Sequence, residues 1–280
     1  MGSKQKYADM TCLSFIAWAF AMLCQVPDFI IHESTPDFDV DMLFSLFSAL
    51  YWIHSYVCGP NDLGLPCRRR RRYTLMVKKG KFMLMEDFDD IGFGHLFFHT
   101  VILQGDKYFC APDELVQNYM VVIREEKGLP ERNARGDPWK WIDLLKAGDR
   151  VRLLMHLYKA RTSSSYMEGR SYLFNARQSW SFSKSLTTLM PTLLTKTSYI
   201  YSVHHKRVLI PIEHLGVMGV PFPGQCSDVE QHYPVVSLIK AGRFTMDEMT
   251  HAAGNGMIAK HVGAVILFTL GCCQRVDSTM

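Results

Sequence analysis

Two short motifs near the C-terminal end of the sequence constrain the fold most strongly. The first spans residues 207–221, and the second is Gly254-Asn255-Gly256-Met257. Pro211 suits the first turn of a helix, because its fixed φ fits that turn and its missing N–H is not needed there. Glu213 falls in the same turn and complements the positive helix end. Gly219 and the proline that soon follows end the helix, so we predict one short helix after Pro211.

A longer helical pattern surrounds the second motif. Thr245 and Glu248 form a capping box, which predicts the start of a helix. The apolar pattern is interrupted at residues 254–256 and resumes over 257–270. Two glycines around one asparagine let the backbone approach another group closely. A turn between two helices that binds no ligand would give the same pattern, so both interpretations stay open.

The order, spacing and residue types of the two motifs resemble the C-terminal end of the cytosine-5 DNA methyltransferase family. In that family, R-x-L-x-P-x-E-x-L-x-x-M/Q-G-x-P precedes G-N-(S/A/G)-(V/M) at a similar distance. The resemblance implies S-adenosyl-L-methionine as the cofactor, double-stranded DNA as the partner and methylation of cytosine C5 as the reaction. It also implies that Asn255, Gly256 and Met257 border the cofactor, and that the protein is nuclear or otherwise intracellular.

Composition sets limits on the class of protein. The chain has 280 residues and 48% apolar content, which is enough for a buried core. Its net charge of +4 is mild, so binding to a polyanion would depend on a local patch. Its eight cysteines have no C-x-x-C or Cys/His ligand spacing. We therefore expect a reduced intracellular protein without a metal site.

The N-terminal sequence contains an apolar run, residues 12–24, which follows Lys4 and Lys6. A signal peptide has this outline, but Trp18 and Phe20 lie within the run and no small-residue cleavage site follows it. The run is also short for a membrane span. We predict a buried helix and no membrane partner, with a targeting segment or a membrane-targeted protein as the weaker alternative.

Helical and strand patterns alternate in the first part of the chain. We predict a helix over residues 8–25, a short parallel strand ending at Glu33, a helix over 40–56 and a strand over 73–77. This order is half of a doubly wound, Rossmann-like α/β sheet. Short aromatic runs and turn signals then predict a smaller mixed domain.

The predicted domain boundaries follow from these patterns and from the resemblance. Residues 1–78 are expected to form the C-terminal half of a catalytic α/β domain. Residues 79–206 would be the target-recognition domain, and residues 207–280 a hinge and helices that return to the catalytic domain. The fold class is thus α/β, with an incomplete methyltransferase sheet.

Glu33 is the first candidate for chemistry, because open α/β sheets place ligands at the carboxyl ends of their strands. A carboxylate there can accept from an exocyclic amine or, when protonated, donate to a ring nitrogen. A surface glutamate without a role is the alternative. The family has Glu-Asn-Val at this point and this chain has Glu33-Ser34-Thr35. The resemblance implies that Glu33 holds the flipped cytosine.

A run of five arginines precedes the last predicted strand. In extended backbone, Arg69 and Arg71 share one face, while Arg68, Arg70 and Arg72 share the other. One face can enter a pocket while the other contacts phosphate, with which arginine forms bidentate hydrogen bonds. A solvated basic patch or a nuclear-localisation signal is the alternative.

The arginine run also matches a family motif, G-x-P-Q-x-R-x-R. Residues 64–71 fit it, with Cys67 in place of the usual glutamine. The match implies that Arg69 and Arg71 are catalytic residues that organise the base pocket, with Arg71 placed for the cytosine carbonyl. It assigns Arg68, Arg70 and Arg72 to nucleic-acid binding.

Two weaker motifs lie between the arginine run and Arg207. Residues 175–178, Asn-Ala-Arg-Gln, resemble the family's Arg-Gln element, and residues 191–193 resemble its Pro-Thr-Leu element. In the family these elements brace the target-recognition domain. We therefore expect Arg177 and Gln178 to contribute to nucleic-acid binding.

The family's nucleophile, a cysteine in a Pro-Cys motif, has no counterpart in this chain. Counting back from Glu33 runs past Met1, and Met1-Gly2 resembles the tail of that motif. The glycine-rich cofactor loop is missing as well. We expect a truncated or inactive part of a methyltransferase, whose N-terminal half lies elsewhere and whose first strand becomes an open edge. A non-catalytic DNA-binding relative is the alternative, which Ser34, Thr35 and Cys67 favour slightly.

Overall fold

The computed structural model describes residues 12–131, 140–162, 171–178, 187–195, 199–221 and 241–276. The chain forms two compact mixed α/β units with small antiparallel sheets. The first unit comprises Met1–Cys58, Arg70–Phe98 and Gly263–Met280. The second unit comprises Gly59–Arg69 and His99–Val262. Some predictions lie outside the described residues, namely the start of the N-terminal helix, the Met1-Gly2 resemblance and one of the eight cysteines, Cys226.

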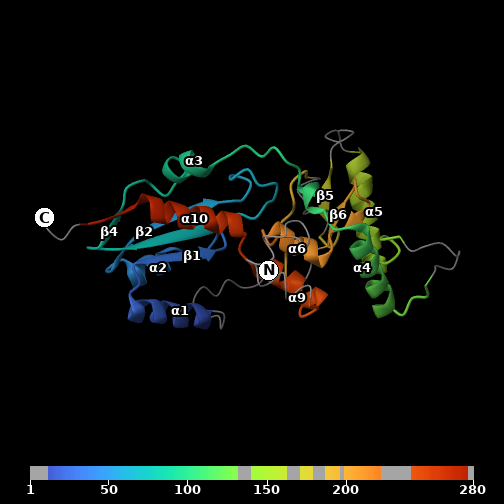
Figure 1. Ribbon diagram of the computed structural model, residues 1–280, viewed down its shortest axis with the longest axis horizontal. Helices are drawn as coiled ribbons and strands as arrows, with labels where there is room; N and C mark the ends of the chain where they lie inside the picture. The colour runs from blue at the N-terminus through green and yellow to red at the C-terminus, as the bar shows by residue number, and fades with distance from the viewer. Residues whose placement is uncertain are drawn as a thin grey trace. The chain divides into compact units, whose positions relative to one another are not determined.

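The first unit contains four helices or parts of helices and five strands among its described residues (Figure 1). Its helices are α1 (Cys12–Gln25), α2 (Asp41–Phe47), α3 (Gly92–Phe97) and the part of α10 (Ala259–Cys272) from Gly263 onward. Its strands are β1 (Phe29–Ser34), β2 (Tyr51–Cys58), β3 (Arg71–Lys78), β4 (Phe82–Leu84) and β8 (Cys273–Arg275).

The main sheet of the first unit has the order β1-β3-β2, and both pairings are antiparallel. Because β3 runs against both neighbours, β1 and β2 run in the same direction. Tyr73 of β3 pairs with Glu33 of β1 and with Tyr56 of β2. The carboxyl ends of β1 and β2 and the start of β3 thus lie at one end of the sheet.

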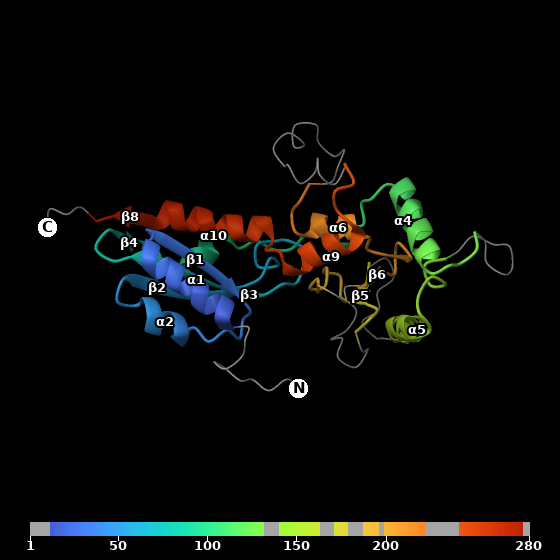
Figure 2. The same ribbon diagram turned by 90° about the horizontal axis from the view of Figure 1, so that it is seen from below.

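Helices cover both faces of this sheet. Figure 2 looks onto α1, which lies across the strands, while α10 and α3 lie on the opposite face. The core beneath α1 and α2 includes Leu43, Phe47 and Met76, all fully buried. On the other face Phe93 packs against Phe268, with ring centroids 5.4 Å apart. These side chains hold the β1-β3-β2 sheet between two helical layers.

The second unit contains helices around a small antiparallel sheet of order β5-β6-β7. Its helices are η1 (Gly105–Tyr108), α4 (Asp113–Glu126), α5 (Ala147–Thr162), α6 (Pro211–Val217), α9 (Met246–Asn255) and the start of α10. Its strands are β5 (Leu173–Asn175), β6 (Ile200–Ser202) and β7 (Arg207–Val208). One apolar cluster joins α4 and α5 to β5 and β6, and a second joins α6 and α9 to residues 190–193.

Several predicted elements of the first unit are confirmed and two are wrong. The strands at β1 and β3 occur where they were expected, and α1 fills the described part of the N-terminal helix. The helix predicted over 40–56 ends at Phe47, and β2 follows it. Apolar residues three and four apart continue into β2, but its aromatic and β-branched residues favour a strand. The predicted parallel pairing of β1 is also wrong, since β1 pairs with β3 in antiparallel fashion. The apolar sequence of a strand that is covered on both faces does not indicate the direction of its neighbour.

The helix starts and ends predicted around the two C-terminal motifs are confirmed. Helix α6 begins at Pro211, and Gly219 follows it with a φ of +89°, a conformation that glycine adopts without strain. Thr245 caps α9 by accepting from the Glu248 N–H, as the capping box requires. Helix α9 ends at Asn255.

By length and composition alone, the stretch Met246–Cys272 is apolar enough to cross a membrane, with a mean hydropathy of 1.3. Buried core helices have the same character, and 33% of its apolar window is buried. This stretch was predicted as helical, not as a membrane segment.

Candidate functional site

Glu33 and Arg71 meet at the carboxyl end of β1. Arg71 is the first residue of β3, and the antiparallel pairing brings it beside the end of β1. Its Nε lies 2.8 Å from Glu33 Oε1, and the two side chains are 19% and 20% exposed. The pair offers a carboxylate and a guanidinium to one ligand at a partly exposed sheet end. Such a combination can bind the donor and acceptor edge of a heterocycle.

The neighbouring arginines of the first unit differ in exposure. Arg72 is half-buried, and its guanidinium donates to the Pro36 carbonyl at 2.9 and 3.1 Å and to Ser55 Oγ at 3.3 Å. Arg70 is exposed and donates to the Val57 carbonyl at 3.2 Å. Arg72 therefore supports the loop after β1, and Arg70 is the better placed of the two for phosphate. In the second unit, Arg68 is also exposed.

Arg69 lies in the interior of the second unit and is 5% exposed. Its Nη1 donates to the Leu193 carbonyl at 3.1 Å, and its Nη2 donates to the Gly254 and Gly256 carbonyls at 2.9 Å each. Three segments that carry separate sequence motifs are thus joined by one guanidinium. The structure gives Arg69 a bracing position, while its predicted part in a base pocket stays a prediction.

The glycines of the second motif permit a close approach, as predicted. A Cβ on Gly254 would lie 2.4 Å from the Thr195 backbone nitrogen, and one on Gly256 would lie 2.9 Å from the Ala252 carbonyl oxygen. The group that approaches Gly254 is the chain itself. This favours the interpretation of a turn packed tightly against residues 194–195.

The predicted cofactor residues are placed on the surface of the second unit. Asn255 is exposed, and its Nδ2 lies 2.9 Å from His251 Nε2. Met257 is 48% exposed. The two cavities described below are lined by neither residue, nor by Gly256. Both side chains are accessible, and their predicted part in binding S-adenosyl-L-methionine stays a prediction.

We expect Gly254→Ala to lower the free energy of unfolding by about 3 kcal/mol, because the new methyl group meets backbone that cannot move aside easily. Urea unfolding followed by circular dichroism measures the change. Gly263→Ala is the matched control, since a Cβ there has no atom within 4 Å and alanine favours a helix. Equal stability of the two variants would contradict the close packing at Gly254.

Arg207 and Glu213 form a buried ion pair within the first motif. The Arg207 Nη1 and Nη2 atoms donate to the two Glu213 carboxylate oxygens at 2.8 and 2.7 Å. Glu213 is fully buried and also accepts from the backbone N–H groups of Ala111 at 2.8 Å and Ile210 at 3.0 Å. Sequence reasoning assigned Glu213 only to the helix end and missed Arg207 as its partner. Their six-residue spacing gave no periodic signal.

His214, next to this ion pair, is a buried imidazole. Burial lowers its pKa to about 4, and the nearby Leu209 carbonyl opposes this only in part. Neither ring nitrogen has a hydrogen-bond partner within the part of the chain that the structure describes. The neutral ring is therefore strongly favoured in the folded protein.

Folding stability should fall as the pH drops from 6.5 to about 4. In this window the unfolded chain binds a proton at His214 and the folded chain does not. The contribution of the neutral His214 ring to folding stability is therefore fully present above pH 6.5 and lost below about pH 4. Its size is on the order of 3 kcal/mol. Urea unfolding at several pH values tests this, with His214→Leu expected to flatten the profile and His251→Gln, at an exposed position, to leave it unchanged. An identical slope in His214→Leu would exclude His214 as the cause.

Arg177 and Gln178 are exposed at the end of β5. The Arg177 guanidinium lies 5.0 Å from the Tyr199 ring centroid, and its Nε lies 3.6 Å from Asp149 Oδ2. Arg177 and these two residues line a cavity of about 790 Å³ that also includes His214. The backbone carbonyl of Gln178 accepts a hydrogen bond from His156 Nε2 at 3.1 Å. Asp149 and Tyr199 carried no motif signal in the sequence.

The buried thiol of Cys67 is unsuited to nucleophilic attack. Burial raises its pKa to about 12, despite the nearby Tyr108 hydroxyl and Arg69 guanidinium. Burial also raises the pKa of Cys273 to about 11. Neither thiol would be ionised at neutral pH. Within the described ranges, no three His, Cys, Asp or Glu side chains are grouped to hold a metal ion.

Neither a scan against protein-family models nor a search of curated proteins finds a match for this sequence. The functional interpretation therefore depends on the motifs and on the geometry of the residues that carry them.

Proposed function

We propose that this chain is the C-terminal part of a DNA cytosine-5 methyltransferase that uses S-adenosyl-L-methionine. The observation that carries the proposal is that its separate motifs contact one another in the fold. Glu33 pairs with Arg71, and Arg69 bonds to the carbonyls of Leu193, Gly254 and Gly256. A chance set of short matches would have no reason to interact in this way.

The fold of the first unit also supports the proposal. Strands β1 and β2 run in the same direction on either side of the antiparallel β3, α2 connects them, and helices cover both faces of their sheet. A strand, helix and strand with parallel strands is the repeating unit of doubly wound sheets. We therefore include an incomplete Rossmann-like sheet in the proposal.

Both edges of that sheet are open in the described part of the chain, because β1 and β2 each have only β3 as a neighbour. On α1, the helix that lies across the strands, Leu13, Ile16 and Phe20 are 55%, 53% and 69% exposed. Exposed apolar side chains beside an unpaired strand are a hazard for a finished sheet. They are expected if further strands of the complete enzyme pair with β1.

In the proposed reaction, Glu33 binds the amino group and ring nitrogen of a flipped cytosine, and Arg71 donates to its carbonyl. A cysteine thiolate from the N-terminal half would add to C6, which makes C5 nucleophilic enough to accept a methyl group, and loss of the C5 proton would then expel the thiolate and restore the ring. The cofactor supplies that methyl group when it is bound. Holding the base in a fixed orientation is the contribution of this chain, and Arg70 and Arg68 are assigned to the phosphates.

Glu33→Gln tests the proposal in a protein that carries the N-terminal half. We expect methyl transfer to DNA to fall at least about a hundredfold, because glutamine cannot switch between accepting from the amine and donating a proton to the ring. DNA binding should remain nearly intact. Glu114→Gln, at an exposed position on α4, is the control and should keep full activity. Unchanged turnover in Glu33→Gln would contradict the assignment.

A non-catalytic DNA-binding relative is the second candidate. The ion pair between Glu33 and Arg71 favours it, because two side chains that neutralise each other can have a purely structural role without binding a base. The same experiment separates the two functions. A protein with both halves and an intact Glu33 that binds DNA but transfers no methyl group would establish the second candidate.

A further inference from the structure

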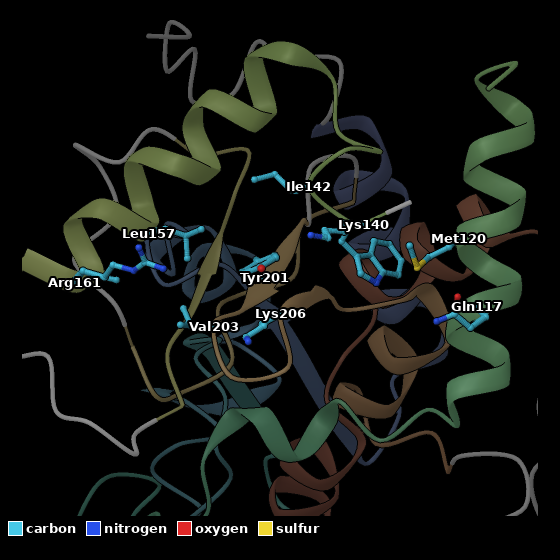
Figure 3. A pocket seen from close by; sticks show the side chains of 11 residues that line it. Gln117, Met120, Lys140, Ile142, Leu157, Arg161, Tyr201, Val203 and Lys206 are labelled. Atoms are coloured by element: carbon cyan, nitrogen blue, oxygen red, sulfur yellow. The ribbon is translucent and has the colours of Figure 1, made fainter. Parts of the chain in front are cut away.

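The second unit contains a cavity of about 660 Å³ that no motif of the sequence touches. It lies between α4, α5, β6 and the turn that joins β6 to β7, as Figure 3 shows. Its volume is in the range of sites that bind small molecules. It is lined by Gln117, Met120, Lys140, Trp141, Ile142, Leu157, Ala160, Arg161, Tyr201, Val203 and Lys206.

The charge of this cavity has a single sign. Lys140, Arg161 and Lys206 line it, and no aspartate or glutamate among the described residues does. Among the described residues, none of the three cations forms an ion pair. They come from separate parts of the unit and surround Tyr201 in Figure 3, with Arg161 on α5 at one side. Like charges gathered around a recess raise the local concentration of anions.

The wall of the cavity is apolar and aromatic. Trp141 and Tyr201 are 7% and 8% exposed and belong to the core that joins α4 to α5. Ile142, Leu157 and Val203 extend this apolar wall. Rings held rigidly by a core offer a flat surface on which a planar group can stack. The cavity thus combines an aromatic wall with three positive charges.

Lys206 has an unusual backbone conformation for its residue type. Its φ is +53°, in the left-handed region that glycine and asparagine adopt most readily. The turn between β6 and β7 thus uses a lysine where a glycine would relieve strain. Strained positions of this kind occur where a side chain serves a ligand site. At Lys206 the strain accompanies an ammonium group at the cavity.

We propose that this cavity binds a nucleotide, with its base against Trp141 or Tyr201 and its phosphate held by Lys140, Arg161 and Lys206. Three donors from three segments suit the several oxygens of a phosphate. The nucleotide can be free, or it can belong to a single strand whose unstacked base enters the cavity. This inference goes beyond the methyltransferase proposal and does not depend on it.

Binding of adenosine monophosphate to the full chain by isothermal titration tests the site, with adenosine and inorganic phosphate as separate probes. We expect the monophosphate to bind more tightly than either part. Arg161→Gln and Lys206→Asn should each weaken it about tenfold, the loss expected for one charge-assisted hydrogen bond. Asparagine tolerates the left-handed conformation of residue 206, which protects the fold. Lys107→Gln, an exposed cation outside the cavity, is the control and should bind as the unaltered chain does.

A short single-stranded oligonucleotide distinguishes the two sources of the nucleotide. If the strand binds more tightly than the monophosphate and is displaced by it, the cavity takes a base from a strand. If the monophosphate binds and the strand does not compete, the ligand is a free nucleotide. The proposal is overturned if neither probe binds, or if Arg161→Gln, Lys206→Asn and Lys107→Gln all bind as tightly as the unaltered chain.

Discussion

Replacing Glu213 by glutamine is expected to lower the free energy of unfolding by about 3–5 kcal/mol. The loss is large because Arg207 would keep its charge in the core without a carboxylate to neutralise it. Glutamine also offers one acceptor oxygen, whereas Glu213 accepts through two oxygens from Arg207, Ala111 and Ile210. Urea unfolding monitored by circular dichroism measures the effect.

Two further variants make this experiment decisive. Glu125→Gln changes a side chain that is 64% exposed and pairs with Arg124, so it should cost less than about 1 kcal/mol. Combining Glu213→Gln with Arg207→Met removes the unpaired charge and should restore part of the lost stability. If Glu213→Gln were as stable as Glu125→Gln, the buried ion pair would not contribute to folding.

Arg69→Lys is expected to lower the free energy of unfolding by about 4 kcal/mol, although it keeps the positive charge. The arginine fork places separate N–H groups on the carbonyls of Leu193, Gly254 and Gly256. A lysine ammonium is a compact group that cannot reach all three, and each carbonyl left without a donor in the interior is destabilising. The expected loss of stability therefore comes from the shape of the side chain and not from its charge.

Arg68→Lys is the matched control for this prediction. Arg68 precedes Arg69 in the same run but its side chain is exposed, so the same substitution should change stability by less than about 0.5 kcal/mol. Thermal unfolding of both variants and the unaltered chain gives the comparison. Similar midpoints for Arg68→Lys and Arg69→Lys would show that the three carbonyl contacts contribute little.

The sequence predicted elements whose signals are local. Pro211 and the pair Thr245 and Glu248 mark helix starts through groups within a few residues, and both starts are found. The two glycines of the second motif predicted a close approach for a similar reason, because a missing Cβ is visible without the partner. What approaches Gly254, however, could not be read from residues 254–257.

Features that depend on partners distant in sequence were not predictable. The pattern over residues 40–56 suits a helix until β3 offers β2 a strand to pair with. The alternation rule placed Arg69 and Arg71 on one face, yet the fold uses them in different units. Nothing local marks the cavity that Lys140, Arg161 and Lys206 share, since Lys140 precedes α5, Arg161 lies near the end of α5, and Lys206 follows β5 and β6.

The way the chain is divided between its units has a consequence for isolating the second one. The polypeptide passes from one unit to the other four times, after Cys58, Arg69, Phe98 and Val262. No single stretch of sequence encodes the second unit. A fragment restricted to residues 99–262 would lose Arg69, and with it the donor to the carbonyls of Leu193, Gly254 and Gly256. An isolated second unit would therefore need residues 59–69 joined to residue 99 by an engineered linker.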